Sequence, residues 1–462
     1  MRPTRHRTPA RVLSLLSVVL LAGCALVAAE ERVPSEPRTL VLALDGVPYD
    51  AAVEAWWQGA FRGWPGPAAL VAPFPSMTNV SFTAILEPFG VEPIEGYEVR
   101  RFDVENNDMV GGVFDYQPFP WKKKFDLYSR SLPAKAKDYI FPDSSFRAMM
   151  GKVDELVLES EEDLLFAYIL ATDNIGHYRG GGAVTPFLVD LSEHLVELTR
   201  RHEERFGRSL RIVMFSDHGN TDNTVYHCDG LKKRLRKAGL RVKKRLKKAN
   251  DVVMPTFGVV SYVALFLHPE WASTAARAVV AHPGVDLAAW VSGAETLTVL
   301  SDDGEARIRW RDGTDGRWFA YAPVEGDPLL LAEERARLAT GGSLAPGGFA
   351  TAADWFAETA LSEYPDPLRR LVDSLTGTHV VHSATVILSL EDGSAVGLPT
   401  ARLGAGLRAG HLGGTHGALD RASTLGFYAT NDPAFLHGPA VQASDALREL
   451  ALLRQKVSDS EH

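Results

Sequence analysis

Three short apolar runs that end in acidic residues constrain the fold of this chain more than any other feature. Run 210–215 is followed by Ser216-Asp217-His218-Gly219, run 39–44 by Asp45, and run 164–171 by Asp173 with His177 four residues on. Runs that are apolar throughout are typical of strands covered by helices on both faces. Ligands bind at the carboxyl ends of such strands in open α/β sheets, so these side chains are expected to converge there.

Helical patterns alternate with these strands. Thr185 followed by Pro186 is a typical helix start, and the pattern continues to about Arg205. The stretch 73–86 indicates a loop that runs into a helix, and 424–428 a short late strand. We therefore predict an α/β fold with a central, mostly parallel sheet flanked by helices.

The second half of the chain carries a different pattern. Residues 296–322 predict a three-stranded antiparallel meander, because alternating runs are separated by Asp-Gly turns. Preceding runs indicate strands at 259–267 and 285–291 with a helix at 271–281 between them. We predict a catalytic core made of residues 39–262 and 378–450, and an inserted α+β cap at 263–377.

The first 24 residues differ from the rest. Four arginines precede the apolar run Val12–Ala22, which is too short to span a membrane as a mature helix. The run ends Leu21-Ala22-Gly23-Cys24, which resembles a bacterial lipobox; an ordinary secretory peptide or a buried helix is the alternative. We predict a signal peptide at 1–23, lipidation of Cys24, a tether at 24–38 and anchoring to the cell envelope, at the outer membrane or periplasmic face in a Gram-negative cell.

The charge balance argues against general nucleic-acid binding. The whole chain carries a formal charge of −9, and removal of the signal arginines makes it more acidic. Residues 232–248 nevertheless hold eleven Lys or Arg. They form either a nucleic-acid or acidic-membrane patch or a solvated helix followed by an edge strand, and the spacing of the leucines favours the second. Cys24 and Cys228 are the only cysteines, so a disulfide framework is excluded.

Six side chains from four separate motifs are candidate metal ligands. They are Asp45, Asp173, His177, Asp217, His218 and, from Gly414-Thr415-His416-Gly417, His416. Taken alone, each histidine is more typical of a surface or core side chain than of a metal ligand. Carboxylates together with three imidazoles suit zinc or manganese better than calcium or magnesium. The glycines beside the histidines allow the backbone to bend closely around an ion.

The order of these motifs resembles that of the alkaline phosphatase superfamily, and most of all its type I phosphodiesterase/nucleotide pyrophosphatase family. The resemblance extends from about Thr39 to Asp432, with residues 226–400 poorly matched. It implies two metal ions, one held by Asp45, Asp217 and His218 and the other by Asp173, His177 and His416. It also implies a nucleophile in Pro75-Ser76-Met77-Thr78, with Thr78 attacking the phosphate ester; Ser76 and Ser81 are the rival nucleophiles.

Some features depart from the family pattern. The diesterases bind a phosphoryl oxygen with an asparagine whose place, counted without a gap, falls on Val99; Asn106 or Asn107 are the alternatives. The signatures of sulfatases and of classical alkaline phosphatases are missing. His227-Cys228-Asp229 is either an extra metal site or a plain thiol, and Lys122-Lys123-Lys124 either meets an anionic substrate or is solvated. The sequence thus predicts a phosphate-ester hydrolase, for diesters or monoesters, with small-molecule substrates. The alternatives are a phosphonate or sulfate-ester hydrolase, a phosphotransferase, or a metal-binding lipoprotein with a relic site.

Overall fold

The computed structural model describes residues 36–460 except 113, 114, 116, 129–136, 139, 315 and 398–410. The predicted signal peptide, Cys24 and most of the predicted tether lie outside these residues, so their assignment stays a prediction. Among the residues described, no helix is long and apolar enough to cross a membrane.

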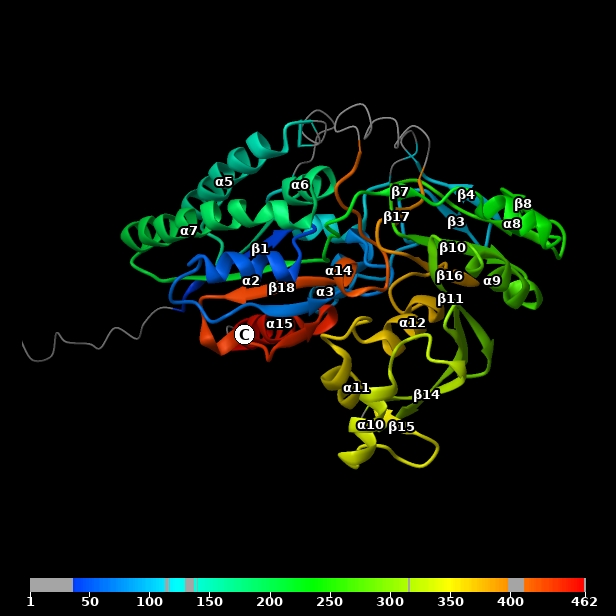
Figure 1. Ribbon diagram of the computed structural model, residues 1–462. Coiled ribbons are helices and arrows are strands. Elements are labelled where there is room, and N and C mark those ends of the chain that lie inside the picture. The colour runs from blue at the N-terminus through cyan, green and yellow to red at the C-terminus, as the bar shows by residue number, and fades with distance from the viewer. Residues whose placement is uncertain are drawn as a thin grey trace, which may run out of the picture.

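A six-stranded sheet with the order β19-β2-β18-β6-β1-β5 forms the centre of the molecule (Figure 1). Its strands are β1 (Arg38–Leu44), β2 (Ala68–Val71), β5 (Leu164–Ile169), β6 (Leu210–Ser216), β18 (Leu425–Thr430) and β19 (Ala440–Gln442). β1 runs parallel to β5 and β6, and β19 runs parallel to β2. Only β18 is antiparallel to its neighbours β6 and β2. The predicted α/β fold with a mostly parallel sheet is confirmed.

Alternate residues of β1 enter two different cores, as the strand period of two requires. Leu40, Leu42 and Leu44 join a cluster with the helices drawn above the sheet in Figure 1, whereas Val41 and Ala43 join a larger cluster on the opposite face. The helices of the first cluster are α2 (Tyr49–Trp57), α5 (Pro142–Glu159), α6 (Ala171–Arg179) and α7 (Thr185–Phe206). The second face is covered by α3 (Thr78–Ile85) and α15 (Arg448–Ser460). Burial on both faces explains why β1 is apolar from Leu40 to Leu44.

A second sheet has nine strands in the order β15-β14-β13-β12-β11-β16-β10-β9-β8, on the right of Figure 1. Its strands are β8 (Arg241–Lys243), β9 (Asp251–Val253), β10 (Tyr262–Leu267), β11 (Val285–Gly293), β12 (Thr296–Ser301), β13 (Gly304–Gly313), β14 (Gly316–Gly326), β15 (Phe349–Thr351) and β16 (Val386–Leu390). The antiparallel pairs β12–β13 and β13–β14 confirm the predicted meander.

The predicted limits of the inserted cap fall inside this second unit. Residue 263 lies within β10, which pairs with β9 and β16, and residue 377 caps α12 (Pro367–Thr376). The other helices of this part are α8 (Leu231–Lys237), α9 (Ala272–Val280), α10 (Ala332–Thr340) and α11 (Ala352–Thr359). The division into core and cap stays a prediction, with its first limit falling inside β10.

The basic segment 232–248 forms α8 and the edge strand β8, as the leucine spacing indicates. Leu231 and Leu235 are buried, while most of the basic side chains around them are exposed. Two short pairs complete the described strands. β3 (Arg101–Asp103) and β4 (Asp108–Val110) are antiparallel, whereas β7 (Tyr226–His227) and β17 (Ser394–Ala395) are parallel and far apart in the sequence.

Asp286 in β11 gives the fold a pH dependence that can be measured. Burial raises the pKa of Asp286 from 3.8 to about 7, although the Tyr364 hydroxyl donates a hydrogen bond to its carboxylate at 2.8 Å. Because the pKa is higher in the folded than in the unfolded chain, this group costs stability as the pH rises through about 4 to 7. We expect Asp286→Asn to remove roughly 1–3 kcal/mol of the stability loss between pH 5 and pH 8. Urea unfolding of both proteins at the two pH values measures this, and identical pH slopes would contradict it.

Candidate metal centre and nucleophile

The ends of three neighbouring strands bring the first acidic side chains together. Leu44 at the end of β1 is level with Ser216 of β6 on one side and with Ile169 of β5 on the other. Asp45 and the pair Asp217-His218 therefore follow strands that end at the same level of the sheet. All three of these residues are fully buried.

Asp173 and His177 reach the same place from a helix rather than from a strand end. The predicted strand 164–171 is too long, because β5 ends at Ile169 and α6 begins at Ala171. Residues four apart on a helix lie on one face, and the Nε2 atom of His177 is 3.4 Å from an Asp173 carboxylate oxygen. Helix α6 thus presents both side chains together.

His416 completes the group from a loop late in the chain. Its ring stacks on that of His218 with 3.9 Å between ring centroids, and the ring of His177 lies 5.2 Å away. The backbone of His416 is held in place by Ser261, which donates its N–H to the His416 carbonyl at 2.9 Å. At Gly417, φ is +115°, and a Cβ there would meet Tyr262 and Met77.

Each of the three imidazoles is oriented by a backbone carbonyl. The Nδ1 atoms of His177, His218 and His416 lie 3.0, 2.8 and 2.9 Å from the carbonyl oxygens of Gly414, Gly219 and Ser76. A carbonyl oxygen can only accept, so each Nδ1 carries the hydrogen. In a neutral imidazole the lone pair is then on Nε2, which is the arrangement of histidines that bind metal ions.

The spacing of the inward-facing atoms fits the shell of a metal ion. The His218 Nε2 atom lies 3.5 Å from an Asp45 oxygen and 3.4 Å from an Asp217 oxygen. Two ligand atoms held at zinc distances and a tetrahedral angle are about 3.4 Å apart. Two groups have their potential ligand atoms within 4.8 Å of one another: Asp45 with Asp217 and His218, and Asp173 with His218 and His416. The first matches the set that the resemblance implies. In the second, His218 stands where His177 was expected, although His177 still contacts Asp173.

The buried carboxylates of this centre would be stabilised by a bound cation. Burial, and then the charge of Asp217, raise the pKa of Asp45 well above its usual range, and burial also raises the pKa of Asp217. Burial acts to raise the pKa of Asp173 as well, but the adjacent His177 lowers it overall. One oxygen of Asp217 has no hydrogen bond within the described part of the chain. Buried carboxylates that crowd one another with an oxygen left over are stabilised by a bound metal ion.

Thr78 places a hydroxyl group at this centre. It is the first residue of α3, and its Oγ1 atom lies 3.2 Å from His218 Nε2 and 3.4 Å from an Asp45 oxygen. The rival Ser76 is buried, and its Oγ contacts the Pro73 and Ala418 carbonyls. Ser81 is also buried, on the first turn of the helix. Of the three hydroxyls, only that of Thr78 contacts the candidate metal ligands in the structure.

Two further features of the centre gave no signal in the sequence. The Tyr168 hydroxyl donates a short hydrogen bond to the second carboxylate oxygen of Asp45. Tyr168 reads in the sequence only as one more apolar strand residue. At Gly46, φ is +63° and a Cβ would lie 2.5 Å from an Asp173 oxygen, so the turn after β1 has room only for glycine.

Arg370 connects the segment 75–78, which carries Thr78, to the loop that follows His416 through buried hydrogen bonds. Its buried guanidinium donates to Ser76 Oγ at 3.0 Å, to Thr424 Oγ1 at 2.8 Å, and to the carbonyls of Pro365 and Leu419 at 2.9 and 3.0 Å. Ser76 in turn accepts the Nδ1 hydrogen of His416. Arg370 belongs to α12, so sequence periodicity explains its place on a helix but not this role.

We expect Arg370→Met to destabilise the protein by about 3–5 kcal/mol, because four buried acceptors lose their donor. Burial lowers the pKa of Arg370 to about 9, and the nearby charge of Asp366 offsets part of that cost. Urea unfolding measures the change. The matched control is Arg369→Met on the same helix, whose side chain is partly exposed; an equal loss in both variants would contradict a special role for Arg370.

The structure gives the alternative asparagines other partners. Asn106 bonds to Asp103, with its Nδ2 at 2.8 Å, and Asn107 exchanges hydrogen bonds with the backbone of Leu246. Val99 is half-buried and packs against the large core cluster. The replacement of the diesterase asparagine by Asn106 or Asn107 is therefore not supported.

The segment His227-Cys228-Asp229 does not form a candidate metal group within the described residues. The buried Cys228 thiol lies 3.4 Å from Nδ1 of His282, and the Nε2 atom of that ring is 2.8 Å from the Asp229 carbonyl. Hence Cys228 is a buried thiol beside one histidine.

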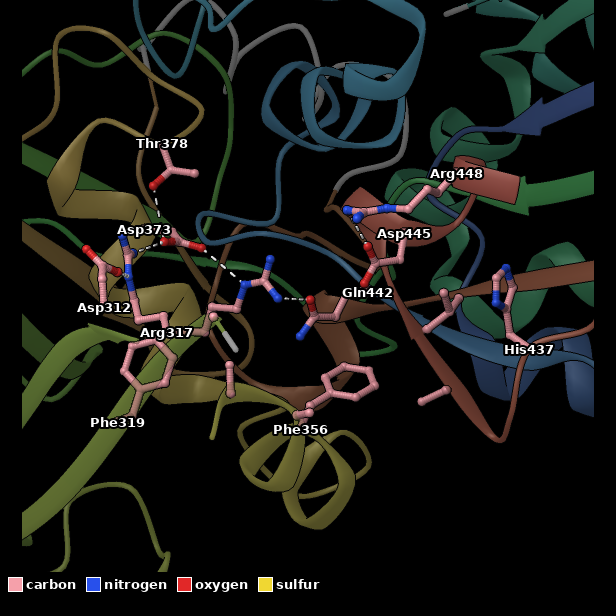
Figure 2. Close-up of a pocket in the computed structure, with 16 residues that line it drawn as sticks. Asp312, Arg317, Phe319, Phe356, Asp373, Thr378, His437, Gln442, Asp445 and Arg448 are labelled. Atoms are coloured by element: carbon pink, nitrogen blue, oxygen red, sulfur yellow. Dashed lines mark hydrogen bonds and ion pairs between the residues drawn. The ribbon is translucent and has the colours of Figure 1, made fainter. Parts of the chain in front are cut away.

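A cavity of about 710 Å³ lies elsewhere, between β14, α11 and the C-terminal segment (Figure 2). None of the candidate site residues lines it. Its charged side chains are paired with one another: Arg317 contacts Asp312 and Asp373, and Arg448 contacts Asp445. The two candidate metal groups therefore do not line this cavity.

Comparisons with known proteins place the chain in a family. A family model described as type I phosphodiesterase/nucleotide pyrophosphatase matches residues 45–352. No curated protein matched in sequence. Human ectonucleotide pyrophosphatase/phosphodiesterase 5 is similar at 12% identity and TM-score 0.48, over 90% of this chain and 95% of that one. Phosphonoacetate hydrolase from Sinorhizobium meliloti 1021 in complex with phosphonoformate is similar at 13% identity and TM-score 0.47, over 91% and 96%.

Proposed function

The chain belongs to the type I phosphodiesterase/nucleotide pyrophosphatase family and is a phosphoric ester hydrolase, and we propose that it works through Thr78 with two divalent metal ions. The observation that carries this proposal is the position of the Thr78 hydroxyl. It lies within 3.4 Å of both a histidine and a carboxylate of the first candidate metal group. A hydroxyl in this position is suited to nucleophilic catalysis.

The candidate ligands divide between two ions. Asp45, Asp217 and His218 would hold the ion next to Thr78, and Asp173, His177 and His416 would hold the other; zinc fits these ligands best, and manganese also suits them. When bound, such ions supply Lewis-acid stabilisation of the charge that develops on the oxygens of the ester during in-line displacement. The three backbone carbonyls keep the imidazoles in the required tautomer.

The residues of the chain then perform two displacement steps. The Thr78 hydroxyl gives up its proton to water, and its Oγ1 atom forms a bond to phosphorus while the bond to the leaving oxygen breaks. The leaving oxygen takes up a proton from water. Water then attacks the phosphoryl-threonine, the bond to Oγ1 breaks, and phosphate leaves with Thr78 restored. Thr78 opens α3, so the positive end of the helix dipole faces the phosphoryl group. Tyr168 keeps Asp45 in place throughout.

An ester panel on the purified protein tests the proposal. Residues 25–462 loaded with zinc or with manganese are assayed on nitrophenyl phosphate, bis-nitrophenyl phosphate and nitrophenyl sulfate, and the metal content is measured in parallel. Turnover of a phosphate ester with about two metal ions per chain is expected. Exclusive turnover of the sulfate, or of a phosphonate added to the panel, would favour a sister activity of the superfamily. Transfer to an added alcohol would reveal a phosphotransferase, and inactivity on every ester with both metals would point to a relic site.

We also propose that the protein is a lipoprotein of the bacterial cell envelope, anchored through Cys24. The support is the order of basic flank, short apolar run and Leu21-Ala22-Gly23-Cys24. Incorporation of labelled palmitate into the wild-type protein but not into Cys24→Ala is expected in the native host. Equal labelling of both proteins, or none, would overturn the assignment.

A further inference from the structure

A buried amide lies beside the second candidate metal group. Asn220 comes two residues after His218, and it is only 3% exposed. Its Nδ2 atom lies 3.4 Å from the Oδ1 atom of Asp173. The reverse orientation of the amide would place its oxygen against a carboxylate oxygen, and neither of these atoms can donate. Asn220 therefore donates a hydrogen bond to a candidate metal ligand.

This is the only side-chain hydrogen bond that Asn220 makes within the described part of the chain. The Oδ1 atom of the same amide is buried and has no hydrogen bond among those residues. A buried acceptor without a donor costs folding free energy. An apolar side chain of similar size would avoid this cost, so the donor to Asp173 is what distinguishes the asparagine from such a side chain.

The amide is held between the helix that carries Asp173 and the loop that carries His416. A Cβ atom at Gly176 of α6 would lie 2.8 Å from the Nδ2 atom of Asn220, and a Cβ atom at Gly414 would lie 2.5 Å from its Oδ1 atom. Both positions therefore have room only for glycine. Because the amide is packed closely on two sides, it has little freedom to turn away from the carboxylate.

The backbone next to Asn220 is fixed as well. Thr221 donates its N–H to the carbonyl of Thr415 at 2.9 Å, and Thr415 donates its N–H to the Thr221 hydroxyl at 3.0 Å. Gly181 donates its N–H to the Thr221 carbonyl at 2.9 Å. These bonds connect residue 221 to the loop before His416 and to the segment after α6. An amide on a backbone held in this way is suited to orient another side chain.

Asp173 requires orientation because its carboxylate faces two histidines. Its Oδ2 atom lies 3.4 Å from the Nε2 atom of His177, and its Oδ1 atom lies 3.8 Å from the Nε2 atom of His416. Rotation about the Cβ–Cγ bond would move both oxygens away from these positions. The bond from Asn220 keeps Oδ1 on the side of His416. At 3.4 Å this bond is long, so a lone pair of Oδ1 stays available for a metal ion.

We propose that Asn220 is a positioning residue for the second metal ion, because it holds the carboxylate of Asp173 in the orientation that binds this ion. The inference rests on the proposed two-ion function and deepens it, since occupancy of the second site then depends on a residue that is not a ligand. The three side chains of the first candidate group make no hydrogen bond with the Asn220 side chain in the described residues. The first ion should therefore bind independently of the amide.

Titration calorimetry with zinc on the metal-free protein tests the proposal. We expect the wild type to bind two ions, and Asn220→Ala to bind one with unchanged affinity and the other about 10- to 100-fold more weakly. Asn220→Leu fills the space without supplying a donor and should show the same loss. The matched control is Asn174→Ala, which should leave both affinities unchanged. Asn174 is 2% exposed and directly follows Asp173, but its Nδ2 atom makes no hydrogen bond in the described chain.

Turnover at different zinc concentrations gives a second readout. A residue that acts through occupancy of the second site lowers kcat at limiting zinc, and kcat recovers once zinc exceeds the weakened Kd about 100-fold. A loss of kcat in Asn220→Ala that persists at this concentration would overturn the inference, because the amide would then not act through the ion.

The stoichiometry of zinc binding separates failure of this inference from failure of the proposed function. Wild-type affinities for both ions in Asn220→Ala and Asn220→Leu, or an equal weakening of both ions, would overturn the role of Asn220 and leave the two-ion enzyme in place. A wild type that binds fewer than two zinc ions at saturation would instead contradict the proposed function.

Discussion

Thr78→Ala is expected to lower kcat by about 10⁴-fold or more, because the oxygen that attacks phosphorus is removed. The metal content should remain near that of the wild type, since the six candidate ligands are all other residues. The substitution removes one hydroxyl and one methyl group at a half-buried position, so the fold should be kept. Turnover of the preferred nitrophenyl ester, followed under single- and multiple-turnover conditions, is the measurement.

Two matched variants show whether the effect belongs to the nucleophile. Thr78→Ser keeps the oxygen and is expected to retain turnover within about 100-fold of the wild type. Ser81→Ala lies one turn further along α3, where the buried Ser81 hydroxyl has no hydrogen bond within the described chain. That variant should be active. Wild-type turnover by Thr78→Ala, or complete loss in Ser81→Ala alone, would exclude Thr78 as the nucleophile.

The sequence was most informative where strands are buried on both faces. The runs around Leu42 and Val213 are mostly apolar because helices cover both sides of β1 and β6. These strands, and the acids that follow them, could therefore be identified without a structure. The predicted strand 164–171 extends to the first residue of α6, the helix that carries Asp173. Leu170 and Ala171 continue the apolar run of β5, and no Gly or Pro marks the point at which the helix begins.

Other parts of the centre depend on contacts that no local pattern records. The bond from Arg370 to Ser76 spans a sequence separation of 294, and that from Tyr168 to Asp45 a separation of 123. Strands β2 and β19 have four and three residues, too few to show a period. Lys122 appeared in the sequence only as one of three adjacent lysines. Its Nζ lies over the Trp121 ring, and that contact exists only because the 3₁₀ turn Pro120–Lys124 folds onto α3.

Asp217→Asn should separate the stability of the protein from its activity. We expect kcat/KM to fall on the order of 10³-fold, since a metal ligand that stabilises transition-state charge is weakened by several kcal/mol. In the metal-free protein, by contrast, Asp217→Asn is expected to raise the free energy of unfolding. The folded-state pKa of Asp217 is raised, first by burial, so its ionised carboxylate costs folding free energy at neutral pH. An asparagine avoids this cost, and its amide oxygen can still accept the Gly46 N–H that Asp217 accepts at 3.1 Å.

Thermal unfolding with chelator and with excess zinc tests this reversal. In chelator at pH 8, Asp217→Asn should be more stable than the wild type by roughly 1–2 kcal/mol. In zinc at about 100 times its Kd the wild type gains about 2.7 kcal/mol, and the variant gains less because its site is weakened. The order of the two Tm values should therefore change between the two conditions. A wild type that is the more stable protein even in chelator would mean that Asp217 stabilises the fold without an ion. A variant that stays the more stable protein in zinc would mean that Asp217 does not contribute to metal binding.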